Sequence, residues 1–392
     1  MTKAAEEKSQ EPIATAPPAQ DEPTVPVVAG AGDEPPKKRL PRVESLTGLR
    51  WWAAFFVFTH HMTSLAPLPI AKFLGLGISG VTFFFVLSGF VLTWSARPGT
   101  KVTTFYRRRF ARIWPAHMVA LLASIFVFYR VHPDPTMTWI KPLSIGVLLL
   151  SVVLLHGWSN NPAIIWGGNP ASWTLSVEAF FYAYFPFVWR ATARLKEVGG
   201  AVMCAVVALA GLLYYPALYR WPDVVPTLPQ PVLHSVSFLF GIGLAIMLRS
   251  GWRPRVPVWA TFVLTGLALY TLYKTGLHPR QYPFGVTLAL TQRVSLAVVY
   301  GILIFAVASR DMRGGRSLLR SRPMVALGKW SYSFYLIHAT LIYAIREQTG
   351  AHAVSWSNLT WYAGLLALSI FASWLLYKFV EHPLEKRLRG PR

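Results

Sequence analysis

The stretch TGLRWWAAFFVFTHHM, residues 47 to 62, is an apolar run with an arginine near its start and two adjacent histidines near its end. A membrane-spanning helix needs about 17 to 25 predominantly apolar residues, and this run approaches that length. Ionisable groups are costly in hydrocarbon and are functional candidates when they occur inside such a run. The stretch therefore predicts a helix that crosses a membrane and carries functional polar side chains.

The composition of the whole chain is that of a membrane protein. Of its 392 residues, 54% are hydrophobic and 14% are charged, which is too apolar for a soluble protein of this size. Lys and Arg outnumber Asp and Glu by 38 to 16, an excess that fits the positive-inside rule and attraction to anionic lipid headgroups. No basic-aromatic motif indicates nucleic-acid binding. The single cysteine, Cys204, excludes a disulfide framework, and the histidines are too scattered to predict a metal site.

The apolar runs predict an all-α membrane protein, a polytopic bundle of about ten transmembrane helices. They lie near residues 48–66, 77–95, 114–130, 172–189, 199–217, 232–248, 257–273, 286–308, 327–345 and 359–378. A shorter run at 143–158, LSIGVLLLSVVLLHGW, decides the topology. The positive-inside rule places the basic segments that follow it in the cytoplasm, and they reach that side only if this run does not span the membrane fully. We therefore expect both termini in the cytoplasm and residues 131–171 as an outward or re-entrant excursion. Either 143–158 or 172–189 is then the partial element.

The first 42 residues differ in composition from the rest. They are rich in Pro, Ala and Glu, lack the apolar segment of a signal peptide, and end in the basic sequence KKRLPR. They predict a disordered cytoplasmic tail, followed by one membrane domain over residues 43–392.

Two ionisable residues of the first predicted span share a helix face. Arg50 and His61 are eleven residues apart, which is three turns plus about 20°, whereas His60 points about 80° away from Arg50. A rise of about 1.5 Å per residue separates the pair by about 16 Å. This spacing fits a binding charge at one end of a channel and a reactive base at the other. A histidine that only joins two helices by a hydrogen bond is the alternative.

A basic cluster, RRRFAR, opens the third predicted span. Arg109 and Arg112 are an i, i+3 pair on one face of that helix, beside Arg107 and Arg108. A stop-transfer signal explains Arg107 and Arg108. Paired guanidinium groups at a membrane edge also bind phosphates in forks that lysine cannot match, which makes Arg109 and Arg112 candidates for anion binding.

The run ASWTLSVEAFFYAYFPF places Glu178 deep among apolar and aromatic residues. A buried carboxylate needs a cation or a proton, so we expect it to pair with an arginine or histidine of another helix, in a structural or a catalytic role. Trp173, Ser176 and Tyr182 are candidates to line the same cavity, although an interfacial aromatic belt also explains the tryptophan.

A polar stripe runs along the ninth predicted span, GKWSYSFYLIHATLIY. Ser331, Tyr335 and His338 fall at i, i+4 and i+7 and predict a face turned to the bundle interior, where they bind substrate hydroxyls or hold helices together. Near the C-terminus, Glu381 in FVEHP predicts a salt bridge to one of the arginine clusters.

Six of these segments, in this order, resemble the signature series of the acyltransferase 3 family of bacterial membrane O-acyltransferases. They are TGLR with a histidine after ten further residues, FFFVLSGF, RRFARIWP, SWTLSVEAFFY, SYSFYLIH and FVEHP, and the resemblance extends from about residue 45 to 388. The family's Arg and His motif maps onto Arg50 and His61, its RxxR motif onto Arg109 and Arg112, and its glutamate onto Glu178. Ala179 stands where many members have a second acid. No hydrolase-like domain is fused here, which implies that the membrane domain recognises the acceptor itself or releases its product directly.

The resemblance implies acyl transfer, commonly of acetyl, from cytoplasmic acyl-CoA to a hydroxyl of a carbohydrate or a glycosylated molecule in the bacterial cytoplasmic membrane. Arg109 and Arg112, with Arg50, would hold the phosphates of the donor, and His61 would act as general base, with Glu178 orienting His61 or an arginine. An acyl-histidine relay is the alternative chemistry. Acyl-CoA is then a co-substrate, and no cofactor or metal is expected.

The acceptor is open between an envelope glycan and a glycosylated secondary metabolite such as a macrolide. Trp173, Ser176, Tyr335 and His338 are the candidate acceptor-binding residues. A transporter or flippase for a lipid-linked or exported small molecule is the alternative function, and it predicts inverted repeats that we do not find in the sequence. Neither the acyl chain length nor the oligomeric state can be inferred.

Overall fold

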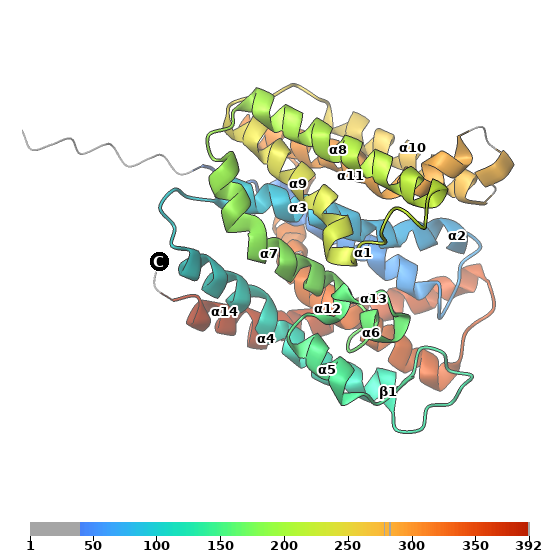
Figure 1. Ribbon diagram of the computed structural model, residues 1–392. Coiled ribbons are helices and arrows are strands. Elements are labelled where there is room, and N and C mark those ends of the chain that lie inside the picture. Colours follow the sequence, from blue (N-terminus) through green and yellow to red (C-terminus); the bar gives the residue numbers. More distant parts are fainter. Residues whose placement is uncertain (1–39, 278, 282–283, 391–392) are drawn as a thin grey trace, which may run out of the picture. The chain divides into compact units, whose positions relative to one another are not determined.

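The computed structural model describes residues 40–277, 279–281 and 284–390. Of the predicted tail at 1–42, only residues 40–42 lie within this part of the chain; the rest is outside the described residues. The described elements are helices, apart from one pair of two-residue strands (Figure 1).

Each of the ten predicted apolar runs overlaps one long helix among the helices and strands of the described chain. They are α1 (Glu44–Met62), α2 (Ala71–Leu74), α3 (Gly80–Ser95), α4 (Val102–Phe128), β1 (Tyr129–Arg130), β2 (Lys141–Pro142), α5 (Ile145–Val152), α6 (Pro162–Ile165), α7 (Trp173–Thr192), α8 (Glu197–Arg220), α9 (Gln230–Arg249), α10 (Val258–Leu277), α11 (Gly285–Met312), α12 (Arg322–Thr349), α13 (Leu359–Leu376) and α14 (His382–Leu388). Short 3₁₀ helices occur at Gly75–Ser79, His156–Trp158, Pro279–Gln281, Leu318–Arg320 and Trp356–Asn358, and a π-helical turn at Tyr377–Glu381.

Six helical segments of the described chain are long and apolar enough to cross a membrane, which supports an all-α multi-pass membrane protein. They are Ala71–Ser95, Val102–Phe128, Glu197–Arg220, Gln230–Arg249, Gly285–Met312 and Trp356–Leu388. Helices α1, α7, α10 and α12 have 19 to 28 residues but are less apolar, so the count of about ten spans stays a prediction. Three of these four helices carry the predicted site residues, and those polar side chains lower their apolar character.

The run at 143–158 does not cross a membrane as one helix. It forms α5, with only eight residues, and then a 3₁₀ turn. A helix of eight residues is about 12 Å long, far short of the hydrocarbon thickness of about 30 Å. The neighbouring run at 172–189 forms the 20-residue helix α7. Helix length therefore favours 143–158 over 172–189 as the partial element. Strand β1 pairs in parallel with β2 at the base of the loop before α5.

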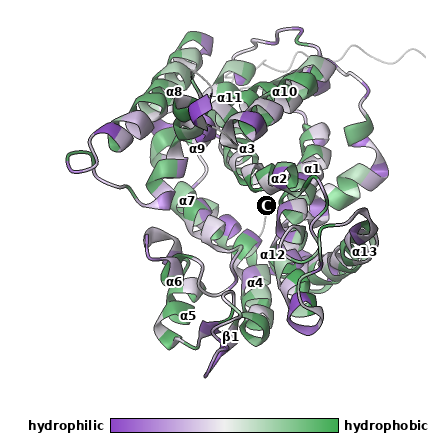
Figure 2. Ribbon diagram, turned by 90° about the vertical axis from the view of Figure 1, so that its right-hand side faces the viewer, coloured by the Kyte–Doolittle hydropathy of each residue, from purple (hydrophilic) through white to green (hydrophobic). Residues whose placement is uncertain are grey.

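The bundle is held together by several closely packed helix pairs. Helix α9 packs against α3 and α8, α11 packs against α10, and α1 packs against α12, which also contacts α13. Figure 1 shows α8, α9 and α11 running side by side. Apolar residues cover much of α8 and α10 (Figure 2), with exposed side chains that include Val206, Leu209, Trp259 and Leu267. These faces have the character of surfaces that contact lipid.

Helices α3 and α9 approach each other at a pair of glycines. A Cβ atom on Gly89 would lie 2.0 Å from the carbonyl oxygen of Phe238, and one on Gly241 would lie 2.0 Å from that of Val86. Small residues allow such close backbone contact in membrane helices, where packing drives association. Any side chain at either position would force the two helices apart.

Charged side chains fix two helix ends. The carboxylate of Asp311, at the end of α11, accepts hydrogen bonds from the Ser45 backbone N–H (2.9 Å) and hydroxyl (2.6 Å) in the first turn of α1. Arg249 donates to the carbonyl oxygens of Thr93, Trp94 and Ala96 at the end of α3. An acid at a helix start and a cation at a helix end both match the helix dipole.

Candidate active site

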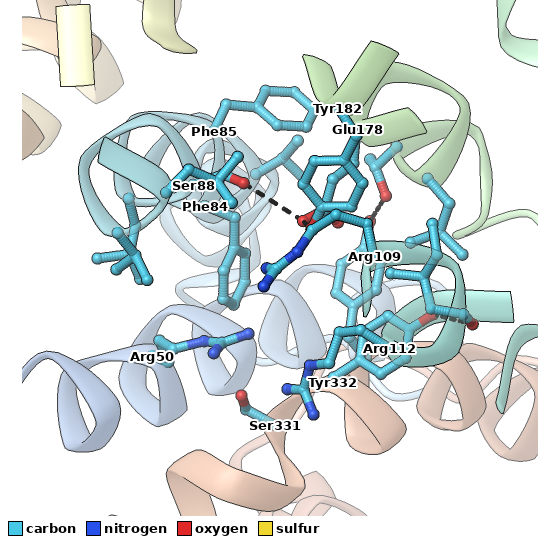
Figure 3. Close-up of a pocket in the computed structure, with 18 residues that line it drawn as sticks. Arg50, Phe84, Phe85, Ser88, Arg109, Arg112, Glu178, Tyr182, Ser331 and Tyr332 are labelled. Carbon is cyan, nitrogen blue, oxygen red and sulfur yellow. Dashed lines mark hydrogen bonds between the residues drawn. The ribbon is translucent and has the colours of Figure 1, made fainter. Parts of the chain in front are cut away.

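A cavity of about 130 Å³ lies between α1, α3, α4, α7 and α12. Its wall combines apolar side chains of α3 with the three predicted arginines Arg50, Arg109 and Arg112, and with Glu178 of α7. Figure 3 shows the side chains of these arginines, from α1 and α4, directed toward the same space. The predicted donor-binding residues are therefore brought together in one place.

Arg112 is held by carboxylates of the C-terminal segment. Its Nη1 lies 2.5 Å from Glu381 Oε1 and 3.1 Å from Glu385 Oε2, and the Glu381 side chain is completely buried. Ser333 also donates a hydrogen bond of 2.6 Å to Glu381, and the guanidinium carbon of Arg112 lies 5.7 Å from the centre of the Tyr332 ring. The predicted salt bridge of Glu381 to an arginine cluster is confirmed. Sequence reasoning missed Glu385, although its place one turn after Glu381 was a usable signal.

Arg109 and Arg50 have a different environment from Arg112. Arg109 lies 5.7 Å from the ring centres of Phe105 and Tyr182. Within the described residues, no carboxylate forms an ion pair with Arg109 or Arg50, and the Nε atom of each is buried without a hydrogen-bond partner. Two guanidinium groups in the cavity wall therefore have no carboxylate partner among the described residues, and this excess of positive charge favours an anion there.

Glu178 is satisfied by hydroxyl groups. Its Oε1 accepts hydrogen bonds from Tyr182, one turn further along α7, and from Ser88 of α3 at 3.3 Å. No arginine or histidine of the described residues forms an ion pair with it, so the prediction of a direct cationic partner is wrong. The i, i+4 spacing brings the Tyr182 hydroxyl within reach before any group of another helix.

His61 lies outside the wall of this cavity, at the other end of α1. It is half-buried, and its ring centre is 5.1 Å from those of His60 and His338 and 6.4 Å from that of Tyr343. Neither ring nitrogen of His61 forms a side-chain hydrogen bond within the described residues. His60 instead bonds to the Gly75 carbonyl at 2.8 Å through Nδ1. Glu178 lines the cavity, and His61 does not.

The polar stripe of α12 leads from the cavity toward His61. Ser331, Tyr335 and His338 are all buried, which confirms that this face turns to the bundle interior. Tyr335 lines the cavity, and its ring centre lies 5.9 Å from that of His338. The His338 Nδ1–H donates to the Phe334 carbonyl at 2.9 Å, which leaves Nε2 as a buried acceptor without a partner.

Trp173 and Ser176 lie apart from the cavity wall. Ser172 and Ser176 place their hydroxyl oxygens 3.2 Å from the two ring nitrogens of buried His156, so this face of α7 holds the excursion in place. The Trp173 ring packs against Trp166 and His234, with centres 5.7 and 5.5 Å away. Acceptor binding by Trp173 and Ser176 stays a prediction.

Comparison with known proteins places these residues in a family context. The family model described as an acyltransferase domain matches residues 43–378. The chain is 34% identical to the acyltransferase MdmB of Streptomyces mycarofaciens, over 90% of this chain and 94% of that protein.

Two relatives are more distant. The peptidoglycan O-acetyltransferase OatA of Listeria monocytogenes is 24% identical over 88% of this chain and 56% of its own length. The exopolysaccharide production protein ExoZ of Rhizobium meliloti is 26% identical over 81% of this chain and 92% of its own length. No solved structure matches the chain.

Proposed function

Because the chain belongs to the acyltransferase 3 family, we propose that it moves an acyl group, acetyl in the first instance, from acyl-CoA to a hydroxyl of a carbohydrate or a glycosylated natural product. The names of two relatives, a peptidoglycan O-acetyltransferase and an exopolysaccharide production protein, support a carbohydrate acceptor. The 34% identity to an acyltransferase along nearly the whole chain supports acyl transfer and leaves the acceptor open between the two classes.

The cavity with two unpaired arginines is the observation that carries this proposal. Arg50 and Arg109 bring two positive charges into a partly enclosed space without ion-pair partners from the described chain. The phosphates of acyl-CoA supply several negative charges, and guanidinium groups bind phosphate through charge-assisted hydrogen bonds. Arg112, already paired with two glutamates, would shape the cavity and contribute its remaining N–H groups. This cavity would face the cytoplasm, where acyl-CoA is made, with both termini on the same side.

His61 is the proposed general base. The acceptor hydroxyl gives its proton to the His61 ring while its oxygen bonds to the thioester carbonyl carbon. The carbon–sulfur bond then breaks, and the proton passes from His61 to the departing thiolate, which yields the ester and free CoA. In the alternative, His61 attacks the thioester first and passes the acyl group on. Glu178 would act in the donor cavity, where its carboxylate balances the arginine charge while Tyr182 holds it in place.

The test uses the full chain in lipid nanodiscs with acetyl-CoA labelled in the acetyl group. The acceptors are peptidoglycan fragments, exopolysaccharide oligosaccharides and a glycosylated macrolide. Label should enter one of these products, and His61→Ala should lower the rate by about 100-fold or more, the usual contribution of a general base. His132→Ala, an exposed histidine in the excursion, is the matched control.

The outcomes separate the alternatives. Unchanged transfer by His61→Ala would remove this residue from the chemistry. Acetyl label that stays on the wild-type protein without acceptor, and is lost in His61→Ala, would establish the acyl-histidine route. No transfer by the wild type, together with movement of the same compounds across vesicles, would favour the transporter.

A further inference from the structure

A cluster of aromatic and charged side chains lies on the side of His61 away from Arg50. It consists of Trp139, from the excursion, with Tyr343 and Arg346 of α12. The guanidinium carbon of Arg346 lies 4.1 Å from the centre of the Trp139 ring and 5.7 Å from that of Tyr343. The Trp139 and Tyr343 ring centres are 6.0 Å apart. We call these three residues the outer cluster.

The outer cluster adjoins the proposed base. The Tyr343 ring centre lies 6.4 Å from that of His61, which is also in contact with His338. Arg346 stands eleven residues after Tyr335, the residue of α12 in the wall of the donor cavity, so the two share a helix face about 16 Å apart. His61, on the neighbouring helix α1, therefore lies between two sites on α12: the donor cavity at Tyr335 and the outer cluster at Tyr343 and Arg346.

Three polar atoms of Trp139, Arg346 and His338 lack hydrogen-bond partners within the described residues. Trp139 Nε1 and Arg346 Nε are buried donors without an acceptor, and His338 Nε2 is a buried acceptor without a donor. The neighbouring acid Glu347 accepts a hydrogen bond of 2.6 Å from Arg130 Nη2, and no carboxylate of the described residues forms an ion pair with Arg346. Buried polar groups are nearly always satisfied, and unsatisfied ones indicate a ligand or water. A hydroxylated molecule offers both the acceptors and the donors that these atoms lack.

We propose that Trp139, Tyr343 and Arg346 form the acceptor-binding subsite and that they take a sugar ring. The rings of Trp139 and Tyr343 would contact the apolar face of the sugar, as aromatic side chains do in ligand sites. The two N–H donors would bind ring oxygens, and one further hydroxyl would reach His61. This subsite rests on the proposed acyl transfer and lies at the opposite end of His61 from the donor, so donor and acceptor approach the base from different sides.

The test is photo-cross-linking, which needs no acyl transfer. The full chain in nanodiscs is irradiated with a glucoside or an N-acetylglucosaminide that carries a diazirine, with and without excess methyl glycoside. Competed label should map to peptides around residues 131–143 and 339–349. Trp139→Ala and Arg346→Met should each weaken labelling about tenfold, the effect of one lost charge-assisted hydrogen bond or ring contact. Arg346→Lys keeps the positive charge but removes the planar guanidinium group, so it shows which of the two properties the ligand needs.

Trp158→Ala is the matched control, because Trp158 lies in the same excursion but packs against Phe180, with ring centres 5.0 Å apart. Unfolding midpoints are measured for every variant to exclude misfolding. Labelling around Trp173 and Ser176, labelling unaffected by both substitutions, or no competed labelling would overturn the subsite. Competed labelling of the outer cluster without any acetyl transfer would support the subsite and contradict the proposed function.

Discussion

Separate replacement of Arg109 and Arg112 by methionine should have opposite effects, although the two residues belong to one RxxR pair. Arg112 compensates the completely buried Glu381 and also bonds Glu385. Removing one partner of a buried ion pair costs about 3 to 5 kcal/mol. The Arg112 side chain is 23% exposed, so we expect a loss near the lower end, about 3 kcal/mol of unfolding free energy. Among the described residues Arg109 pairs with no carboxylate, so its replacement should change stability by about 0.5 kcal/mol or less.

Donor binding should show the reverse order. If Arg109 binds phosphate, its replacement removes at least one charge-assisted hydrogen bond, worth about 1.5 to 3 kcal/mol. The dissociation constant of acetyl-CoA should then rise by about 10- to 150-fold. Arg112→Met, measured at a temperature where the variant is folded, should raise the dissociation constant of acetyl-CoA by a smaller factor than Arg109→Met.

The assay combines calorimetric titration of acetyl-CoA with denaturant unfolding of each variant in detergent. The double variant Arg112→Met/Glu381→Gln completes a thermodynamic cycle, because it removes both charges and should recover part of the stability. Wild-type stability of Arg112→Met, or an Arg109→Met variant that binds acetyl-CoA as tightly as the wild type, would refute this division of roles.

Three further predictions concern the scaffold. Gly241→Val should cost about 3 kcal/mol of unfolding free energy, because its Cβ would meet the fixed Val86 carbonyl, whereas Gly266→Ala, which has open space around it, should be nearly neutral in the same denaturant titration. Burial lowers the pKa of Lys141 from 10.5 to about 8, so the unfolded chain binds more protons between those values, and the unfolding midpoint should rise with pH there, a rise that Lys141→Met removes. Replacing His156 by alanine should remove one hydrogen bond from each of Ser172 and Ser176 and increase amide hydrogen exchange across residues 145–165, while unchanged exchange would contradict the role of His156 in holding the excursion.

Helical periodicity within single elements was enough to predict much of the site. Arg50 and His61 do occupy opposite ends of α1, and Arg109 and Arg112 do enter the cavity from one turn of α4. Covalent spacing along a helix fixes these relations, whatever the tertiary packing. The Arg346 position was accessible in the same way, because its spacing from Tyr335 repeats that of Arg50 and His61.

Contacts between helices were less accessible to sequence reasoning. In a soluble helix, apolar periodicity marks the inner face, but lipid and the bundle interior are both apolar, so the pattern does not say which face turns inward. Ser176 and Trp173 were assigned to the cavity for this reason, yet their face of α7 holds the excursion through His156. Trp139 had no periodic signal at all, because it lies in a loop.

The environment of Glu178 explains how one acid can serve a cavity of arginines without blocking it. A direct ion pair with Arg109 would occupy the N–H groups that a phosphate needs, whereas hydrogen bonds from Tyr182 and Ser88 hold the carboxylate in the same wall and leave those groups free. Its negative charge still lowers the electrostatic cost of burying several guanidinium groups, since Coulomb interactions act over several ångströms at low dielectric. Arg112, by contrast, takes its compensation from Glu381 in direct contact. The arrangement therefore separates the charge that builds the cavity from the charge that is left for a ligand.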